Sequence, residues 1–168
     1  MDEECTLYLL DTNIIVSAVL KGEKIRKCLE KCDAKYVIHK VVIDELIRLI
    51  SEERKFRKIA FKIRKKLKSG KITISEFIRK EFSLIAVLLK ANIQLITEKP
   101  DEESIVRAEK IVGHRDPSDI PIVAIALYLA KNRRNEKVCI WTDDRDVLEE
   151  LPKKEKAVKA VRTPHCCN

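Results

Sequence analysis

Short apolar runs alternate along the chain with longer segments in which apolar residues recur at helical spacing. The runs at 7–10, 36–38, 93–97, 138–141 and 157–161 are too short for helices and predict buried strands. Segments at 14–20, 23–31, 41–50, 101–112 and 122–130 carry apolar positions three and four apart, which is typical of helices packed on a core. Strands that alternate with helices predict an α/β sandwich with a mainly parallel sheet.

The 168 residues suit a single domain, 1–168, and no linker, repeat or low-complexity segment divides them. No apolar run is long enough to span a membrane, and the N-terminus Met-Asp-Glu-Glu lacks the basic start of a signal peptide. We therefore expect a cytoplasmic protein with no membrane partner, whose six cysteines stay reduced. Because no Cys-x-x-Cys pair is present, a structural zinc site has little support, and residues 162–168 read as a tail.

The net charge of +8 comes from one stretch. Residues 54–71 hold ten Lys or Arg and no Asp or Glu, so they carry +10 while the remainder sums to −2. Apolar residues at helical spacing predict an amphipathic helix here, and with the helix after Ser75 it forms an inserted basic helical hairpin at about 54–90. Its cationic face favours a nucleic-acid backbone, with a membrane surface or an acidic protein segment as alternatives. The candidate RNA-binding residues are Arg54, Lys55, Arg57, Lys58, Lys62, Arg64, Lys65 and Lys66.

Four acidic groups stand where parallel strands should bring them together. Two directly follow apolar strands, one precedes an apolar helix, and one lies on the helix after the second strand; they are Asp11, Asp143 with Asp144, Asp116 with Asp119, and Glu45. The carboxyl ends of parallel strands lie at one edge of a sheet, where ligand sites gather. Clustered carboxylates repel unless cations compensate them, and Mg²⁺ or Mn²⁺ accepts such oxygen ligands. The chemistry implied is metal-assisted attack of water on a phosphodiester.

Each group also has a purely structural alternative. Asp11 and Thr12 suit the N-cap of the helix at 14–20, and the acids near 116 and 143 suit caps of the helices that follow them. Asp44 and Glu45 suit a first helical turn, where the helix dipole favours an acid. The metal-site interpretation gains support because the helix at 122–130 and the strand at 138–141 are apolar throughout. Their acids stand only at the ends that should come together in the fold.

Four short motifs follow one another along the chain. They are Leu-Leu-Asp-Thr-Asn at 9–13, Ile-Asp-Glu-Leu at 43–46, Asp-Pro-Ser-Asp-Ile-Pro-Ile-Val-Ala-Ile-Ala-Leu at 116–127 and Trp-Thr-Asp-Asp-Arg-Asp at 141–146. Together they resemble, in the same order, the PIN-domain nucleases, which include VapC-type toxins and RNA-processing enzymes. The resemblance spans most of the chain and implies a PIN-like three-layer α/β/α sandwich with a mainly parallel central sheet.

The resemblance also implies a pocket that binds Mg²⁺ or Mn²⁺ and cuts RNA. Its four catalytic, metal-holding acids fall on Asp11, Glu45, Asp119 and Asp144, and Asp146 follows as a further candidate ligand. Asp119 matches the third position better than Asp116, whereas Asp143 stands one residue ahead of the usual fourth position. The site-orienting residues would be Asn13 and Thr142, through hydrogen bonds, with Thr12 beside them.

These features predict a metal-dependent endoribonuclease, in RNA processing or as the toxin of a toxin–antitoxin pair. RNA, an antitoxin or other protein, and a second copy of the chain are the candidate partners. The alternative is a PIN-like module that binds RNA in a larger assembly without cutting it. A phosphatase that uses Asp11 as nucleophile ranks lower, because such enzymes commonly need a second acid two residues on, where Asn13 stands.

Overall fold

The computed structural model describes residues 4–21, 25, 27–29, 33–51 and 93–167. Its strands are β1 (Leu7–Leu10), β2 (Lys35–His39), β3 (Gln94–Ile96), β4 (Val138–Trp141) and β5 (Val158–Val161). The helices are α1 (Thr12–Lys21), α3 (Lys40–Ser51), α6 (Glu102–Val112), α7 (Ile120–Asn132) and α8 (Arg145–Lys154), with 3₁₀ turns η1 (Pro117–Asp119) and η2 (His165–Cys167). The predicted basic hairpin at about 54–90, and with it every candidate RNA-binding residue, lies outside the described residues.

The five strands form one sheet in the order β3-β2-β1-β4-β5. Every described pair is parallel, as the alternation of strands and helices predicted. The central strands β1 and β4 are buried along their whole length, because helices cover both faces of a parallel sheet. Leu10 stands opposite Trp141 in the register, so the residues after them, Asp11 and Thr142, emerge side by side.

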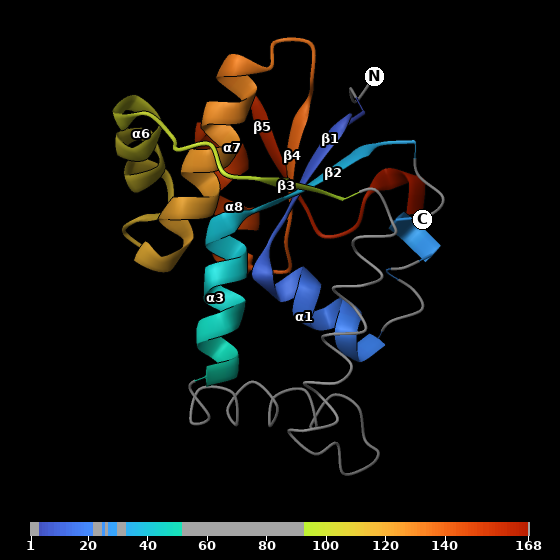
Figure 1. Ribbon diagram of the computed structural model, residues 1–168. Coiled ribbons are helices and arrows are strands. Elements are labelled where there is room, and N and C mark those ends of the chain that lie inside the picture. The colour runs from blue at the N-terminus through green and yellow to red at the C-terminus, as the bar shows by residue number, and fades with distance from the viewer. Residues whose placement is uncertain (1–3, 22–24, 26, 30–32, 52–92, 168) are drawn as a thin grey trace.

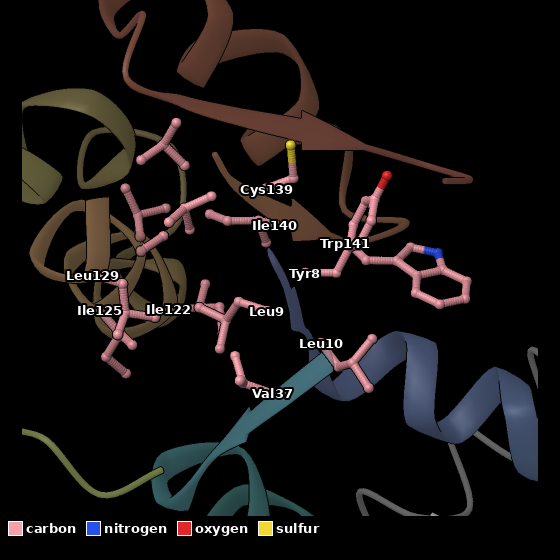
Figure 2. Close-up of a cluster of buried hydrophobic side chains, with 14 of the residues drawn as sticks. Tyr8, Leu9, Leu10, Val37, Ile122, Ile125, Leu129, Cys139, Ile140 and Trp141 are labelled. Atoms are coloured by element: carbon pink, nitrogen blue, oxygen red, sulfur yellow. The ribbon is translucent and has the colours of Figure 1, made fainter. Parts of the chain in front are cut away.

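Helices lie on both sides of this sheet (Figure 1). On one face, Leu9, Val37 and Ile140 point toward α7, which packs between the sheet and α6 (Figure 2). Burying each such aliphatic side chain contributes about 1.5–3 kcal/mol before the cost of ordering the chain. The α7 helix is apolar on nearly every side because it is enclosed in this way.

The opposite face carries an aromatic group made of Tyr8, Tyr36 and Trp141. Tyr8 and Tyr36 stand opposite one another in the register and stack with ring centroids 5.6 Å apart, and the rings of Tyr36 and Trp141 are 6.2 Å apart. Helix α1 lies on this side, next to Leu10 and Trp141 (Figure 2). The sheet is therefore the middle of three layers, as the sequence predicted.

Helix α3 begins at Lys40, directly after β2. His39 starts it: its Nδ1 accepts a hydrogen bond from the Val41 amide (3.0 Å), and its Nε2 donates to the Glu98 carbonyl (2.8 Å). The helix has no acid in its first turn, and Glu45 comes more than a turn after its start. The helix-dipole interpretation is therefore wrong.

Disulfides contradict the expectation of reduced cysteines. Cys5, just before β1, is bonded to Cys139 in β4 across a Cα–Cα distance of 5.9 Å, and Cys28 is bonded to Cys167 across 5.0 Å. Both distances lie in the ordinary range for a bridge, and the described part of the chain contains no free cysteine. The pairs join positions more than 130 residues apart, so only the folded chain brings them together.

No helix in the described ranges is both long enough and apolar enough to cross a membrane.

Candidate active site

The ends of β1 and β4 place Asp11 and Thr142 in direct contact. The Asp11 amide donates to the Trp141 carbonyl (3.1 Å), which continues the ladder of the sheet by one residue. The Thr142 hydroxyl donates to Asp11 Oδ2 at 2.6 Å, and Thr142 is fully buried while Asp11 is 8% exposed. A carboxylate this deeply buried needs partners for both of its oxygens.

Asn13 holds the same carboxylate from helix α1. Its Nδ2 lies 2.9 Å from Asp11 Oδ2 and 3.0 Å from Thr142 Oγ1, and its Oδ1 accepts a hydrogen bond from the Asp143 amide (2.9 Å). One amide side chain thus links the start of α1 to the segment after β4. Asn13 and Thr142 thus both form hydrogen bonds with Asp11, and their orienting role in a functional site stays a prediction.

Asp11 also stands at the start of α1. Its Oδ1 accepts from the Thr12 amide at 2.7 Å, and its carbonyl accepts from Ile14 and Ile15. Burial, above all, raises the pKa of Asp11, and Glu45 and Asp144 add to the rise, while the hydrogen bonds from Thr142 and Thr12 lower it. The Asp11 side chain accepts from the backbone amide of the first residue of α1 and not from that of the second or third, so this bond differs from the usual N-cap bond.

Thr12 connects this centre to Glu45 on α3. Its hydroxyl donates to Glu45 Oε2 at 2.6 Å, across 33 residues of sequence. The contact places the second predicted acid beside Asp11, since Thr12 directly follows it in the chain. Thr12 therefore positions Glu45 in the structure, whereas the sequence assigned it only a place beside the site.

The two acids after β4 turn to different partners. The Asp144 amide donates to Thr142 Oγ1 (2.9 Å), and Asp144 Oδ1 caps α8 by accepting from Asp146 (2.8 Å) and Val147 (3.3 Å). Asp143 Oδ1 lies 3.9 Å from Arg162 Nε. The charge of Asp144 is among the causes that raise the pKa of Asp11 and of Asp119.

Asp116 and Asp119 differ in structural role: one caps a helical turn through its side chain and the other does not. Asp116 Oδ1 accepts from the Ser118 amide (2.8 Å) as the N-cap of η1, and this hydrogen bonding lowers its pKa. Asp119 precedes α7 without capping it through its side chain. Its Oδ2 is buried with no hydrogen-bond partner in the described structure.

The unpartnered oxygen of Asp119 faces other negative charges. Burial and, in falling order, the charges of Asp144, Asp116, Asp11 and Asp146 together raise the pKa of Asp119 to about 7. A buried carboxylate of this kind is costly unless a cation or a proton compensates it. The acids that follow β1 and β4 thus share one electrostatic environment with the acid that precedes α7.

A family comparison agrees with this arrangement. The family model of the PIN domain matches residues 9–158, which is most of the chain and includes all of these acids. The chain belongs to the PIN domain family. PIN domains are in general nucleases that depend on divalent metal ions, and the parallel sheet with helices on both faces is the fold expected of them.

Two other comparisons add little to this assignment. No curated protein matches the PIN domain described here. Among known structures, it is similar to the crystal structure of VapBC2 from Rickettsia felis bound to a DNA fragment from their promoter. That match has a TM-score of 0.48 and 15% sequence identity, and it covers 92% of this chain and 97% of the other. At this level of similarity the assignment rests on the family match.

In this PIN domain the acids do not already stand as a compact ligand set. Within the described ranges, no three His, Cys, Asp or Glu side chains are grouped so that they could hold a metal ion as they are. The donors around the site are nonetheless carboxylate oxygens, which suit a hard cation such as Mg²⁺ or Mn²⁺. The buried oxygen of Asp119 that has no hydrogen-bond partner is an atom that such a cation would stabilise.

A further ion-pair group supports the edge of the site and was missed from the sequence. Arg115 lies between Asp146 Oδ1 (3.8 Å) and the buried Glu150 (3.5 Å), and Lys153 and Lys154 also reach Glu150, at 3.0 and 3.1 Å. The group ties the turn before Asp116 to helix α8. The sequence could not predict this group, because Arg115 and Glu150 are far apart in the chain and meet only through the packing of α6 on α8.

Proposed function

We propose that this PIN domain is an endoribonuclease that depends on Mg²⁺ or Mn²⁺. Asp11, Glu45, Asp119 and Asp144 would hold the ion and form the catalytic set, with Asp146 as a further ligand. The observation that carries the proposal is the buried, unpartnered oxygen of Asp119 beside the charges of Asp144 and Asp11. A divalent cation satisfies that oxygen and cancels the repulsion among the acids.

The chain's own residues prepare the site. When bound, a divalent cation would activate water and stabilise the charge that develops on the phosphate. Asn13 and Thr142 fix Asp11 Oδ2 through hydrogen bonds of 2.9 and 2.6 Å, so this carboxylate is oriented before any ligand arrives. Thr12 does the same for Glu45 Oε2 at 2.6 Å. Such preorganisation lowers the cost of assembling a charged site during the reaction.

RNA is the proposed substrate, because the chain carries a local charge of +10 at 54–71. The eight basic residues named from the sequence remain our candidates for contacts with its phosphates. An antitoxin or another regulatory protein is the proposed protein partner, and a second copy of the chain is a further candidate. The proposed role is RNA processing or that of the toxin in a toxin–antitoxin pair.

A matched pair of variants tests the metal site. Asp119→Asn removes the unpartnered charge. Asp116→Asn changes a carboxylate three residues away whose Oδ1 already accepts the hydrogen bond that caps η1, and Asn retains an oxygen for that cap. We expect Asp119→Asn to lose both Mn²⁺ binding by calorimetry and Mn²⁺-dependent cleavage of a mixed RNA pool. Asp116→Asn should retain both. Equal Mn²⁺ affinity and equal cleavage in the parent and in Asp119→Asn would refute the assignment.

A PIN module that binds RNA without cutting it is the second candidate. It gains support because the acids of the described structure are not grouped ready to hold a metal. The same experiment separates the two functions, since mapping of RNA ends after incubation with Mn²⁺ reports cutting directly. Enrichment of one RNA with no new ends would favour the non-cleaving module.

A further inference from the structure

A pocket lies beside the proposed metal site. It has a volume of about 220 Å³ and is lined by Ile14 and Ser17 of α1, by Trp141 at the end of β4, and by Asp143 and Arg162. Pockets for drug-sized ligands measure roughly 300–1,000 Å³, so this one suits a single ring system. The Cys28–Cys167 disulfide also contributes to its lining and ties the C-terminal tail to this wall.

Asn13 joins the pocket to the site. Its Nδ2 donates to the Asp11 carboxylate, and its Oδ1 accepts from the Asp143 backbone amide. One side chain therefore links the proposed metal ligand to the backbone of the acidic residue that lines the pocket. A strand of RNA with a phosphate at Asp11 would therefore pass next to this pocket. This step rests on the proposed nuclease function.

The polar groups of the pocket form an acceptor and a donor at its rim. Asp143 is 46% and Arg162 is 68% exposed at the side chain, and their closest atoms are 3.9 Å apart, which is longer than a hydrogen bond. The Trp141 Nε1–H donates to the Arg162 carbonyl at 3.1 Å and holds the backbone there. Exposed pairs of this kind contribute little to stability, so a ligand can displace them at small cost.

We propose that this pocket binds a guanine base of the RNA strand next to the cleaved bond. Asp143 accepts hydrogen bonds from the base, Arg162 donates to the adjoining phosphate, and the small exposed parts of Ile14 and Trp141 supply apolar contact. Single-stranded RNA is commonly read in this way, through the hydrogen-bonding edge of an unstacked base and its flat faces. Apolar walls with a few placed polar groups are typical of such pockets.

Guanine suits Asp143 better than the other bases because of its donors. Its N1–H and N2–H₂ groups stand side by side and match the two oxygens of one carboxylate. Adenine and cytosine place an acceptor nitrogen beside their amino group, and uracil flanks its one N–H with two carbonyls. Each of these bases would place an acceptor atom next to a carboxylate oxygen of Asp143, which is also an acceptor. A polar atom left without a hydrogen-bond partner weakens binding.

Trp141 provides a direct probe, because it is the one tryptophan of the chain and it lines the pocket. We would titrate GMP, AMP, CMP, UMP and guanosine into the full chain in EDTA and follow tryptophan fluorescence. GMP should bind at least about tenfold more tightly than the other nucleotides, as expected for hydrogen bonds to a charged acceptor. Asp143→Asn should remove this preference, and Arg162→Ala should weaken GMP without weakening guanosine.

Two exposed positions supply matched controls, Asp33→Asn and Arg134→Ala, and both should bind GMP like the parent. Equal affinity for all four nucleotides, or GMP binding that survives Asp143→Asn, would overturn the proposal. Full competition by inorganic phosphate with no binding of guanosine would also overturn it, because the pocket would then be an anion site.

The titration needs no metal and no cleavage, so its outcome is independent of the nuclease test. A chain that cuts RNA but shows no preference for GMP would lose the guanine pocket alone. A chain that binds GMP but does not cut would retain the pocket within the non-cleaving RNA-binding module.

Discussion

Replacing Asp119 by Asn should stabilise the metal-free protein, and the gain should grow as the pH rises. Burial and the neighbouring acids raise the pKa of Asp119 from 3.8 to about 7. The folded protein therefore holds this proton more tightly than the unfolded chain does. The stability that the protonated group allows is fully present below pH 3.8 and is lost as the pH rises through about 7.

The size of the effect follows from the shift. One pKa unit corresponds to about 1.4 kcal/mol, so a shift from 3.8 to about 7 sets an upper value of about 4 kcal/mol. Asp119 is only partly buried, and solvent screening leaves about 1–2 kcal/mol of the free energy of unfolding. For a chain of this length, each kcal/mol shifts Tm by about 2–4 °C.

Thermal unfolding of the parent and of Asp119→Asn in EDTA, from pH 5 to pH 8, measures this directly. The difference in Tm between the two proteins should widen with pH. Asp116→Asn is the control, because the pKa of Asp116 is lowered on folding and not raised. The ionised Asp116 therefore stabilises the folded protein above pH 3.8, and this contribution does not change between pH 5 and pH 8. Adding Mn²⁺ at pH 8 should raise Tm of the parent and not of Asp119→Asn. A difference that stays constant with pH would refute the reasoning.

Three further changes test other parts of the molecule. Asp11→Asn should stay folded yet lose Mn²⁺-dependent cleavage of RNA, and cleavage at the parent rate would show that the site is misassigned. Thr142→Val removes one donated and two accepted hydrogen bonds in a buried position, so denaturant unfolding should show a loss of about 1–3 kcal/mol; an unchanged midpoint would contradict the network. Reversing the charges of Lys62, Lys65 and Lys66 to Glu should weaken RNA binding and flatten its dependence on salt, and an unchanged slope would argue against contacts from this stretch.

The strands could be predicted because each is an unbroken apolar run bounded by polar residues. The runs at 7–10 and 138–141 match β1 and β4 residue for residue, since burial on both faces leaves no room for alternation. Helix starts were less accurate. Helix α3 begins at Lys40 because His39 bonds to the Val41 amide, and helix α7 begins at Ile120, directly after η1.

The cysteines show where sequence reasoning lacked information. Chain length and the acidic N-terminus favoured free thiols, but the folded chain brings Cys5 to Cys139 and Cys28 to Cys167. Spacing along the sequence carries no signal for pairs this far apart. The Arg115–Glu150 ion pair was missed for the same reason.

The sequence by itself determined which residue types stand at the carboxyl ends of the strands, and hence an acidic site with Asp11 at its centre. It also gave the family, through four motifs in a fixed order. Only the tertiary structure decided what each acid does, because that depends on partners from other elements. Asp116 and Asp119 are chemically identical and three residues apart, yet one bonds to the Ser118 amide and the other keeps a buried oxygen unpartnered. In the same way, Asp143 turns to Arg162, whereas Asp144 stays with Thr142 and the charges around Asp11.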